Sequence, residues 1–125
     1  MLNMLKDFKI IFRTIMEEIT DTQEFTKDMT FEEFKTDRKT QKAVIRGLEI
    51  IGEAMNQIPK DFQKKYYKVD WSKWIKFRNL LIHVYHAVDL ELVWNAIQEE
   101  LPTLYSRMLW LVENPFIPKP SDYKK

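Results

Sequence analysis

The chain has 125 residues and a mass of 15.2 kDa, and its 20 basic and 19 acidic side chains give a net charge of +1. This length is typical of one domain, and the absence of cysteine excludes a disulfide scaffold, a thiol nucleophile and a cysteine-ligated zinc site. The near-neutral charge lacks the strong positive field of a typical duplex-DNA-binding protein. Because no apolar run approaches the roughly 20 residues of a membrane span, and none resembles a signal peptide, we expect a cytoplasmic protein.

Helical periodicity dominates the N-terminal half of the chain. Apolar residues recur every three or four positions from Leu2 to Ile19 and predict a first helix over about residues 2–22. Thr30 and Glu33 form a capping-box pattern that starts a second helical stretch, whose apolar stripe continues to Pro59. Glycine occurs only twice, so long helices are favoured over strands and turns.

The C-terminal half predicts further helices separated by cap residues. A short basic helix and a turn are expected over residues 60–69, and Asp70 and Asp89 are the expected N-caps of two later helices. Pro102 should kink or divide the last one, because proline lacks an N–H and clashes with the preceding turn. Residues 1–113 are therefore predicted to form an all-α, antiparallel bundle of four or five helices, followed by an extended or disordered tail over residues 114–125.

Charge is distributed unevenly along this bundle. From Lys60 to Arg78, seven basic side chains oppose two acidic ones and give a local charge of +5. From residue 79 to residue 118, Arg107 alone opposes five acidic side chains, which gives a local charge of −4. The basic segment is either a solvated helix face or a surface for an anionic ligand, and the sequence leaves both readings open.

Four polar residues within one predicted helix have side chains suited to RNA cleavage: Arg78, Asn79, His83 and Tyr85. Arginine binds phosphate in a bidentate manner, and histidine exchanges protons near neutral pH. When the 2′-hydroxyl of RNA attacks the neighbouring phosphorus, one group must remove the hydroxyl proton and another must stabilise the charged phosphorane. Asn79 lies one helical turn before His83 and could orient the imidazole.

The spacing of Arg78 and His83 poses a geometric difficulty, because they lie about 140° apart around an ideal helix. Their convergence on one phosphate requires a distorted helix, side chains that reach around to one groove, or a second subunit. The alternative reading is structural, with an ion-paired arginine and a histidine satisfied in the core.

Three other sets of residues have competing interpretations. His83, His86 and Asp89 have a spacing that could bring three metal ligands to one face, but the set is small and Asp89 is better used as a cap. Arg46, Glu49 and Glu53 form either a surface salt-bridge row or a set of partners for Arg78. The four tryptophans favour core or dimer-interface packing over the stacking of bases; they are Trp71, Trp74, Trp94 and Trp110.

Three segments of the chain resemble the HepT-like ribonuclease family of the HEPN superfamily. They are DRKTQKAVIRGLEIIGEAMNQIP (37–59), VDWSKWIKFRNLLIHVYHAVD (69–89) and LVWNAIQEELPTL (92–104). The resemblance implies a HEPN-like helical bundle and a dimeric, metal-independent endoribonuclease that acts as a toxin, for which we expect no cofactor. It also implies a partner, a minimal nucleotidyltransferase antitoxin, that neutralises the toxin by transferring AMP to the tyrosine of an R-x4-H-x-Y motif.

Carried over to this sequence, the resemblance makes Arg78 and His83 catalytic and Tyr85 the AMP acceptor, and Asn79 matches the residue that usually follows the arginine. We expect Asn79 and, from the charged row described above, Glu53 to be supporting residues. Phe77 departs from the smaller or more flexible residue that often stands there, which bears on the shape of the groove. Because fold alone does not fix activity, the alternative is a non-catalytic helical module that assembles with a nucleotidyltransferase or a nucleotide. A less favoured reading is a structural homodimer whose polar motif seals its interface.

Overall fold

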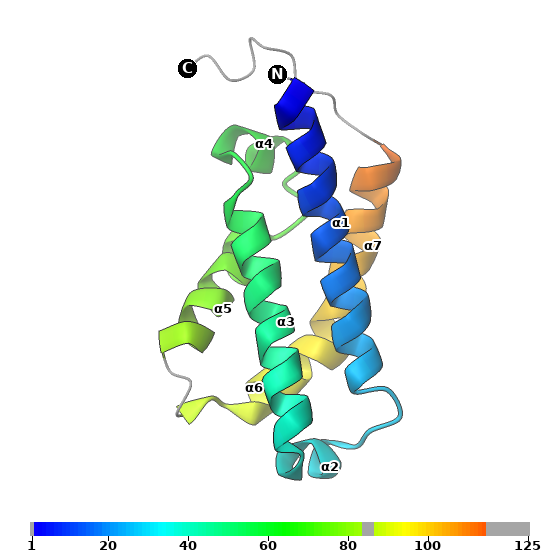
Figure 1. Cartoon of the computed structure of the whole chain (residues 1–125), viewed down its shortest axis with the longest axis vertical. Helices are drawn as coiled ribbons and strands as arrows, with labels where there is room; N and C mark the ends of the chain where they lie inside the picture. Colours follow the sequence, from blue (N-terminus) through cyan, green and yellow to red (C-terminus); the bar gives the residue numbers. More distant parts are fainter. Residues whose placement is uncertain (1, 84–86, 115–125) are drawn as a thin grey trace.

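The computed structural model describes residues 2–83 and 87–114, with side chains from residue 8 onward, as an all-α bundle without strands in those ranges (Figure 1). The elements are α1 Leu2–Phe25, α2 Phe31–Thr36, α3 Arg38–Asn56, α4 Lys60–Lys65, α5 Trp71–His83, α6 Leu90–Asn95, the π-helical turn η2 Ala96–Glu100, and α7 Leu101–Glu113. The predicted fold class is confirmed. Among the described helices, none combines the length and the apolar character that crossing a membrane requires.

The N-terminal helices follow the predicted caps but differ in their boundaries. At Thr30 the capping box forms, with the Glu33 amide donating to the Thr30 hydroxyl at 3.1 Å and the Thr30 amide donating to the Glu33 carboxylate at 2.9 Å. Helix α1 extends to Phe25, beyond the predicted end at residue 22. The expected single stretch that follows is two helices, because the Asp37 carboxylate accepts the Thr40 amide at 3.0 Å and starts a new helix.

The predicted caps of the C-terminal half are also present. Asp70 accepts the Lys73 amide at 3.2 Å, and Asp89 accepts the amides of Glu91 and Leu92 at 3.0 and 3.2 Å. Pro102 divides the last helix as expected, with η2 on its N-terminal side and Pro102 in the first turn of α7. Of the predicted tail, only Asn114 is described, and residues 115–125 lie outside the described residues.

Helix α3 lies at the centre of the bundle, between α1 and α5, and α7 runs alongside α1 (Figure 1). The apolar faces of these helices meet in one core, which includes Ile19, Leu48, Ile51, Met55, Trp74, Leu81, Leu101 and Met108. Helix α5 packs mainly on α3. One side of α5 is therefore open to solvent, and its residues Ser72, Lys76, Asn79 and His83 follow each other at helical spacing with exposed side chains.

Candidate active site

A close approach of two helices positions Arg78. Gly52 of α3 faces α5 where a Cβ would collide with the Cβ of Arg78 and would lie 2.7 Å from the Trp74 carbonyl oxygen. Only glycine lets the two backbones approach this closely. The Arg78 side chain is consequently held against α3 and is 30% exposed, with its guanidinium beside the residue that follows Gly52.

That neighbouring residue, Glu53, joins two arginines. Its Oε1 lies 3.7 Å from Nη2 of Arg78 and 3.3 Å from Nη1 of Arg46, whose Nη1 also lies 3.4 Å from Glu49. Glu53 is therefore a partner of Arg78, as one of the two interpretations of the Arg46–Glu49–Glu53 row predicted. Partial burial opposes the charge of Arg46, but the carboxylates of Glu53 and Glu49 outweigh it and hold the pKa of that guanidinium above its ordinary value.

Asn79 contacts Arg78 rather than the histidine. Its Oδ1 accepts a hydrogen bond from Nη1 of Arg78 at 2.9 Å. The suggestion that Asn79 orients His83 is thus replaced by a contact that fixes the guanidinium from the opposite side to Glu53. The Nε atom of Arg78 is buried and has no hydrogen-bond partner in the described part of the chain. The arginine is held at its outer nitrogens and is otherwise tightly enclosed by α3.

His83 is the last residue of α5 and its side chain is exposed. Since α5 is regular up to this residue, Arg78 faces α3 while His83 lies on the solvent side, as the ideal-helix geometry predicted. The reading of His83 as a satisfied core histidine is excluded by its exposure. A single chain does not bring the two side chains together within the described residues.

Two predicted site residues, Tyr85 and His86, lie outside the described residues. The AMP-acceptor assignment of Tyr85 therefore stays a prediction. Asp89, the third member of the suggested metal set, caps α6 with its carboxylate. No group of three ligating side chains suited to a metal occurs among the side chains that the structure describes, those of residues 8–83 and 87–114.

The tryptophans divide into two groups. Trp71 and Trp74 are buried, and Trp94 is half-buried with its ring centroid 5.3 Å from that of Phe34. Trp110, however, is 46% exposed, so it does not pack in the core, and the alternative expectation of dimer-interface packing stays a prediction for this residue. Helical spacing alone did not reveal that α7 presents Trp110 to the surface.

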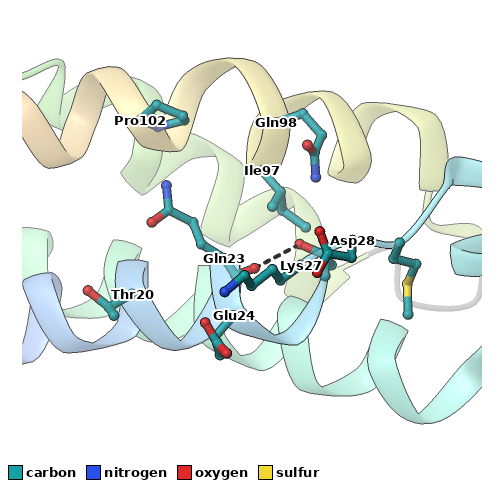
Figure 2. A pocket seen from close by; sticks show the side chains of 10 residues that line it. Thr20, Gln23, Glu24, Lys27, Asp28, Ile97, Gln98 and Pro102 are labelled. Carbon is teal, nitrogen blue, oxygen red and sulfur yellow. Dashed lines mark hydrogen bonds between the residues drawn. The ribbon is translucent and has the colours of Figure 1, made fainter.

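A hollow of about 570 Å³ lies between the C-terminal end of α1 and the π-helical turn, and neither Arg78 nor His83 lines it. Figure 2 shows Gln23, Glu24, Lys27 and Asp28 on one side of it and Gln98 on the facing helix. With two acidic side chains and one basic, this hollow has the wrong charge for a phosphodiester. It is therefore not the candidate site.

Sequence reasoning missed the role of Gly52. Glycine lowers helix stability, so an isolated glycine within a strong helical pattern signals a close backbone approach. That signal was present in the IGEA segment (51–54). It does not identify the partner, because Gly52 and Arg78 lie 26 positions apart and no local spacing links them.

Comparisons with known proteins place the chain in a family. Residues 15–109 match a family model described as Ribonuclease HepT-like. A Methanocaldococcus jannaschii protein named as a candidate RNase is 44% identical over 97 residues, which cover 78% of this chain and 80% of the relative. A Thermococcus cleftensis protein named as a probable ribonuclease HepT is 42% identical over 101 residues, which cover 81% and 92%. No solved structure gives a significant match.

Proposed function

The chain belongs to the HepT-like ribonuclease family, and we propose that it is a metal-independent endoribonuclease, the toxin of a toxin–antitoxin pair. Arg78 and His83 are its proposed catalytic residues, with Asn79 and Glu53 in support, and Tyr85 is its proposed AMP acceptor. The observation that carries the proposal is the guanidinium of Arg78, which Gly52 seats against α3 and which Glu53 and Asn79 hold in place.

The reaction follows from the two side chains. The His83 imidazole takes the proton of the RNA 2′-hydroxyl, whose oxygen attacks the adjacent phosphorus. Arg78 stabilises the negative charge of the phosphorane, and the bond to the 5′-oxygen of the next nucleotide breaks. The His83 imidazolium returns its proton to that oxygen, which leaves as a 5′-hydroxyl, and a 2′,3′-cyclic phosphate remains. A guanidinium already fixed by two partners needs little reorganisation in the transition state, which supports its use as the phosphate-binding group.

A symmetric dimer resolves the separation of Arg78 and His83. Large apolar side chains are exposed around the motif, with Leu80 at 47%, Ile82 at 37% and Leu92 at 43%. A small apolar hollow of about 110 Å³, lined by Leu80 and Leu92 among others, lies beside them. An isologous interface would cover these side chains and bring His83 of one protomer toward Arg78 of the other. Two composite sites then form per dimer.

Regulation by a nucleotidyltransferase is proposed from the R-x4-H-x-Y motif and the family resemblance. An adenylate on Tyr85, two residues beyond His83, would place an anion and a bulky base near Arg78 and compete with RNA for the same guanidinium. Tyr85→Phe keeps the ring but removes the acceptor oxygen. We therefore expect that variant to retain cleavage and to resist neutralisation, with peptide mapping after incubation with the partner and ATP as the measurement.

The main test measures cleavage of a labelled single-stranded RNA by purified protein. His83→Ala and Arg78→Ala should each lower the cleavage rate about 100-fold or more, while circular dichroism stays helical and a chelator has no effect. Full activity of His83→Ala, or loss of activity on chelation alone, would contradict the assignment. A folded wild-type protein that binds the partner but never cleaves RNA would favour the alternative, a non-catalytic binding module.

A mixing experiment tests the composite site. In a heterodimer of Arg78→Ala and His83→Ala chains, one of the two composite sites keeps both intact residues. Because about half of the dimers in an equal mixture are heterodimers, mixing the two inactive variants should restore about a quarter of wild-type activity. Sites contained within single chains would stay inactive in every mixture. A protein that sediments as a monomer at every concentration while fully active would exclude the dimer.

A further inference from the structure

A second surface of the molecule has the chemistry of a nucleic-acid contact. Between the α4–α5 connection and the end of α7 lies a hollow of about 190 Å³. Among the described residues, three aromatic and three basic side chains contribute to its lining and no acidic one does; they are Tyr66, Tyr67, Trp110, Lys65, Lys68 and Arg107. We call it the aromatic–basic hollow. The C-terminal sequence from residue 79 to residue 118 is acidic overall, yet its one basic residue, Arg107, faces this hollow.

Its rings are accessible and firmly mounted. Tyr67 is 77% exposed and Trp110 is 46% exposed, so both present ring surface to solvent. Beneath them, Tyr66 stacks on the buried Phe62 with ring centroids 4.7 Å apart and meets Trp110 edge-on at 6.2 Å. The indole N–H of Trp71 also donates to the Tyr66 carbonyl at 3.0 Å. Tyr66 and Trp110 therefore pack together beside the core, and Tyr67 lies in the turn that follows α4.

Positive charge lies directly beside these rings. The Lys68 ammonium lies 5.1 Å from the centroid of the Trp110 ring. Exposed cation–π contacts are weak, so Lys68 can move toward a phosphate at little cost. Three other hollows, the one in Figure 2, the one beside Lys73 and the small one beside Leu80, each include at least one acidic side chain. The charged side chains that line the aromatic–basic hollow are all basic, although Arg107 also lines the hollow beside Lys73, which contains Asp70, Glu99 and Glu100.

We propose that the aromatic–basic hollow binds single-stranded RNA, with an unpaired base stacked on Tyr67 or Trp110 and backbone phosphates paired with Lys68 and Arg107. Aromatic faces beside cations are the general means of holding single strands without reading their sequence. The volume is below the roughly 300 Å³ of pockets that enclose drug-sized ligands, which suits one base better than a whole nucleotide cofactor. The ligand assignment rests on the proposed ribonuclease function.

The position of the hollow suggests how a substrate strand lies. It adjoins the start of α5, and His83 ends that helix 12 residues later, about 18 Å away along the axis. The exposed row of Ser72, Lys76, Asn79 and His83 runs along α5 between the two ends, and the exposed Asp70 is the acidic side chain beside its start. A strand held in the hollow can therefore follow α5 to the catalytic histidine, so the hollow acts as a substrate-binding site remote from the chemistry.

Binding is measured by fluorescence anisotropy with a labelled 12-nucleotide oligouridine, in a His83→Ala background that leaves the RNA intact. Tyr67→Ala and Lys68→Ala should each weaken binding, Tyr67→Ala by about 5-fold to 100-fold. Lys68→Ala should also reduce the slope of log K against log salt concentration by about 0.7. The matched controls are Lys64→Ala, an exposed basic residue outside the hollow, and Phe25→Ala, a ring that is 47% exposed elsewhere.

A cleavage comparison separates this proposal from the proposed function. In the wild-type background, Tyr67→Ala should raise KM for a long RNA yet leave cleavage of a dinucleotide unchanged, because a dinucleotide cannot reach the hollow. Binding of Tyr67→Ala and Lys68→Ala equal to that of the controls would overturn the hollow as an RNA site, even if the enzyme cleaves RNA. Conversely, a wild-type protein without nuclease activity whose RNA binding depends on Tyr67 and Lys68 would retain the hollow and refute the nuclease. Equal loss of binding to duplex RNA would contradict base stacking.

Discussion

The two glycines of α3 face opposite neighbours and make different contacts. Gly47 meets α1, where an added Cβ would collide with the Thr22 hydroxyl and lie 3.6 Å from the Glu18 carboxylate. Gly52 meets α5, where an added Cβ would collide with the Cβ of Arg78 and approach the Trp74 carbonyl. At Gly47 the obstacle is the end of a side chain, whereas at Gly52 it includes backbone. The first contact can adjust in place, and the second can adjust only by moving α5.

This difference assigns distinct roles to two similar-looking positions. The contact at Gly47 joins α1 to α3, and it encloses a Thr22 hydroxyl that has no hydrogen-bond partner in the described part of the molecule. The contact at Gly52 sets the position of a proposed catalytic arginine. We infer that stability depends on both glycines, while activity depends chiefly on Gly52.

The largest effect is expected from Gly52→Ala. Overpacking costs about 1–3 kcal/mol of unfolding free energy, and displacement of α5 should also lower RNA cleavage about 100-fold, since small misplacements of reacting groups have effects of this size. Urea unfolding and single-turnover cleavage, scaled to the folded fraction, measure the two losses. Normal cleavage by folded Gly52→Ala would show that the contact does not position Arg78.

Gly47→Ala should destabilise by a similar amount, about 1–3 kcal/mol, but leave cleavage per folded molecule near wild type. Adding Thr22→Ala should remove the collision and the unpartnered hydroxyl together, and the methyl at position 47 also favours the helix by about 1 kcal/mol. We therefore expect the midpoint urea concentration of unfolding of the double variant to equal or exceed that of the wild type. Additive destabilisation would mean that Thr22 is not the obstacle.

A smaller effect is expected when the Gly52 region keeps its packing but loses a charge. Glu53→Gln should lower kcat about 3-fold to 10-fold with little change in KM, because a partly exposed ion pair contributes about 1 kcal/mol. Glu49→Gln is the matched control, since Glu49 pairs with Arg46 at 3.4 Å and Arg46 is not proposed to touch RNA. Equal losses in both variants would indicate a general charge effect rather than positioning of Arg78.

The smallest effect concerns Glu18, beside Gly47. Partial burial and the nearby carboxylates of Asp21 and Glu17 raise its pKa above the ordinary 4.5. The folded state thus disfavours the charged carboxylate. The protonated Glu18 side chain therefore adds to the unfolding free energy below pH 4.5, and this addition is lost as pH rises through the raised pKa. Glu18→Gln should melt slightly higher than wild type at pH 7 and equally at pH 3. A variant that melts lower at pH 7 would contradict the pKa direction.

Local chemistry explains what the sequence predicted well. The caps at Thr30, Asp70 and Asp89 each depend on residues within one turn, so their positions could be read directly. The break at Asp37 was missed because the helical pattern continues on both sides of it, and only the carboxylate contact with Thr40 divides it.

The candidate site was predicted in composition and in part of its geometry. Helix periodicity correctly placed Arg78 and His83 on different sides of α5. It did not predict that Asn79 binds Arg78, because side chains at adjacent positions ordinarily diverge around a helix. Nor did it predict the exposure of Trp110 or the seat that Gly52 provides, since both arise from the packing of helices distant in sequence.

The π-helical turn has a consequence for how the molecule opens. From Leu90 to Glu113 the chain is helical without a gap, but α6 packs on α2 while α7 packs on α1. Between them, the wide π-helical turn and Pro102 interrupt the regular pattern of helical hydrogen bonds. Amide protons in the middle of this helical segment should therefore exchange with solvent about as fast as those at the end of a helix. In hydrogen exchange we expect this segment to behave as two cooperative units. Protection of the α6 amides should follow that of α2, and protection of the α7 amides should follow that of α1.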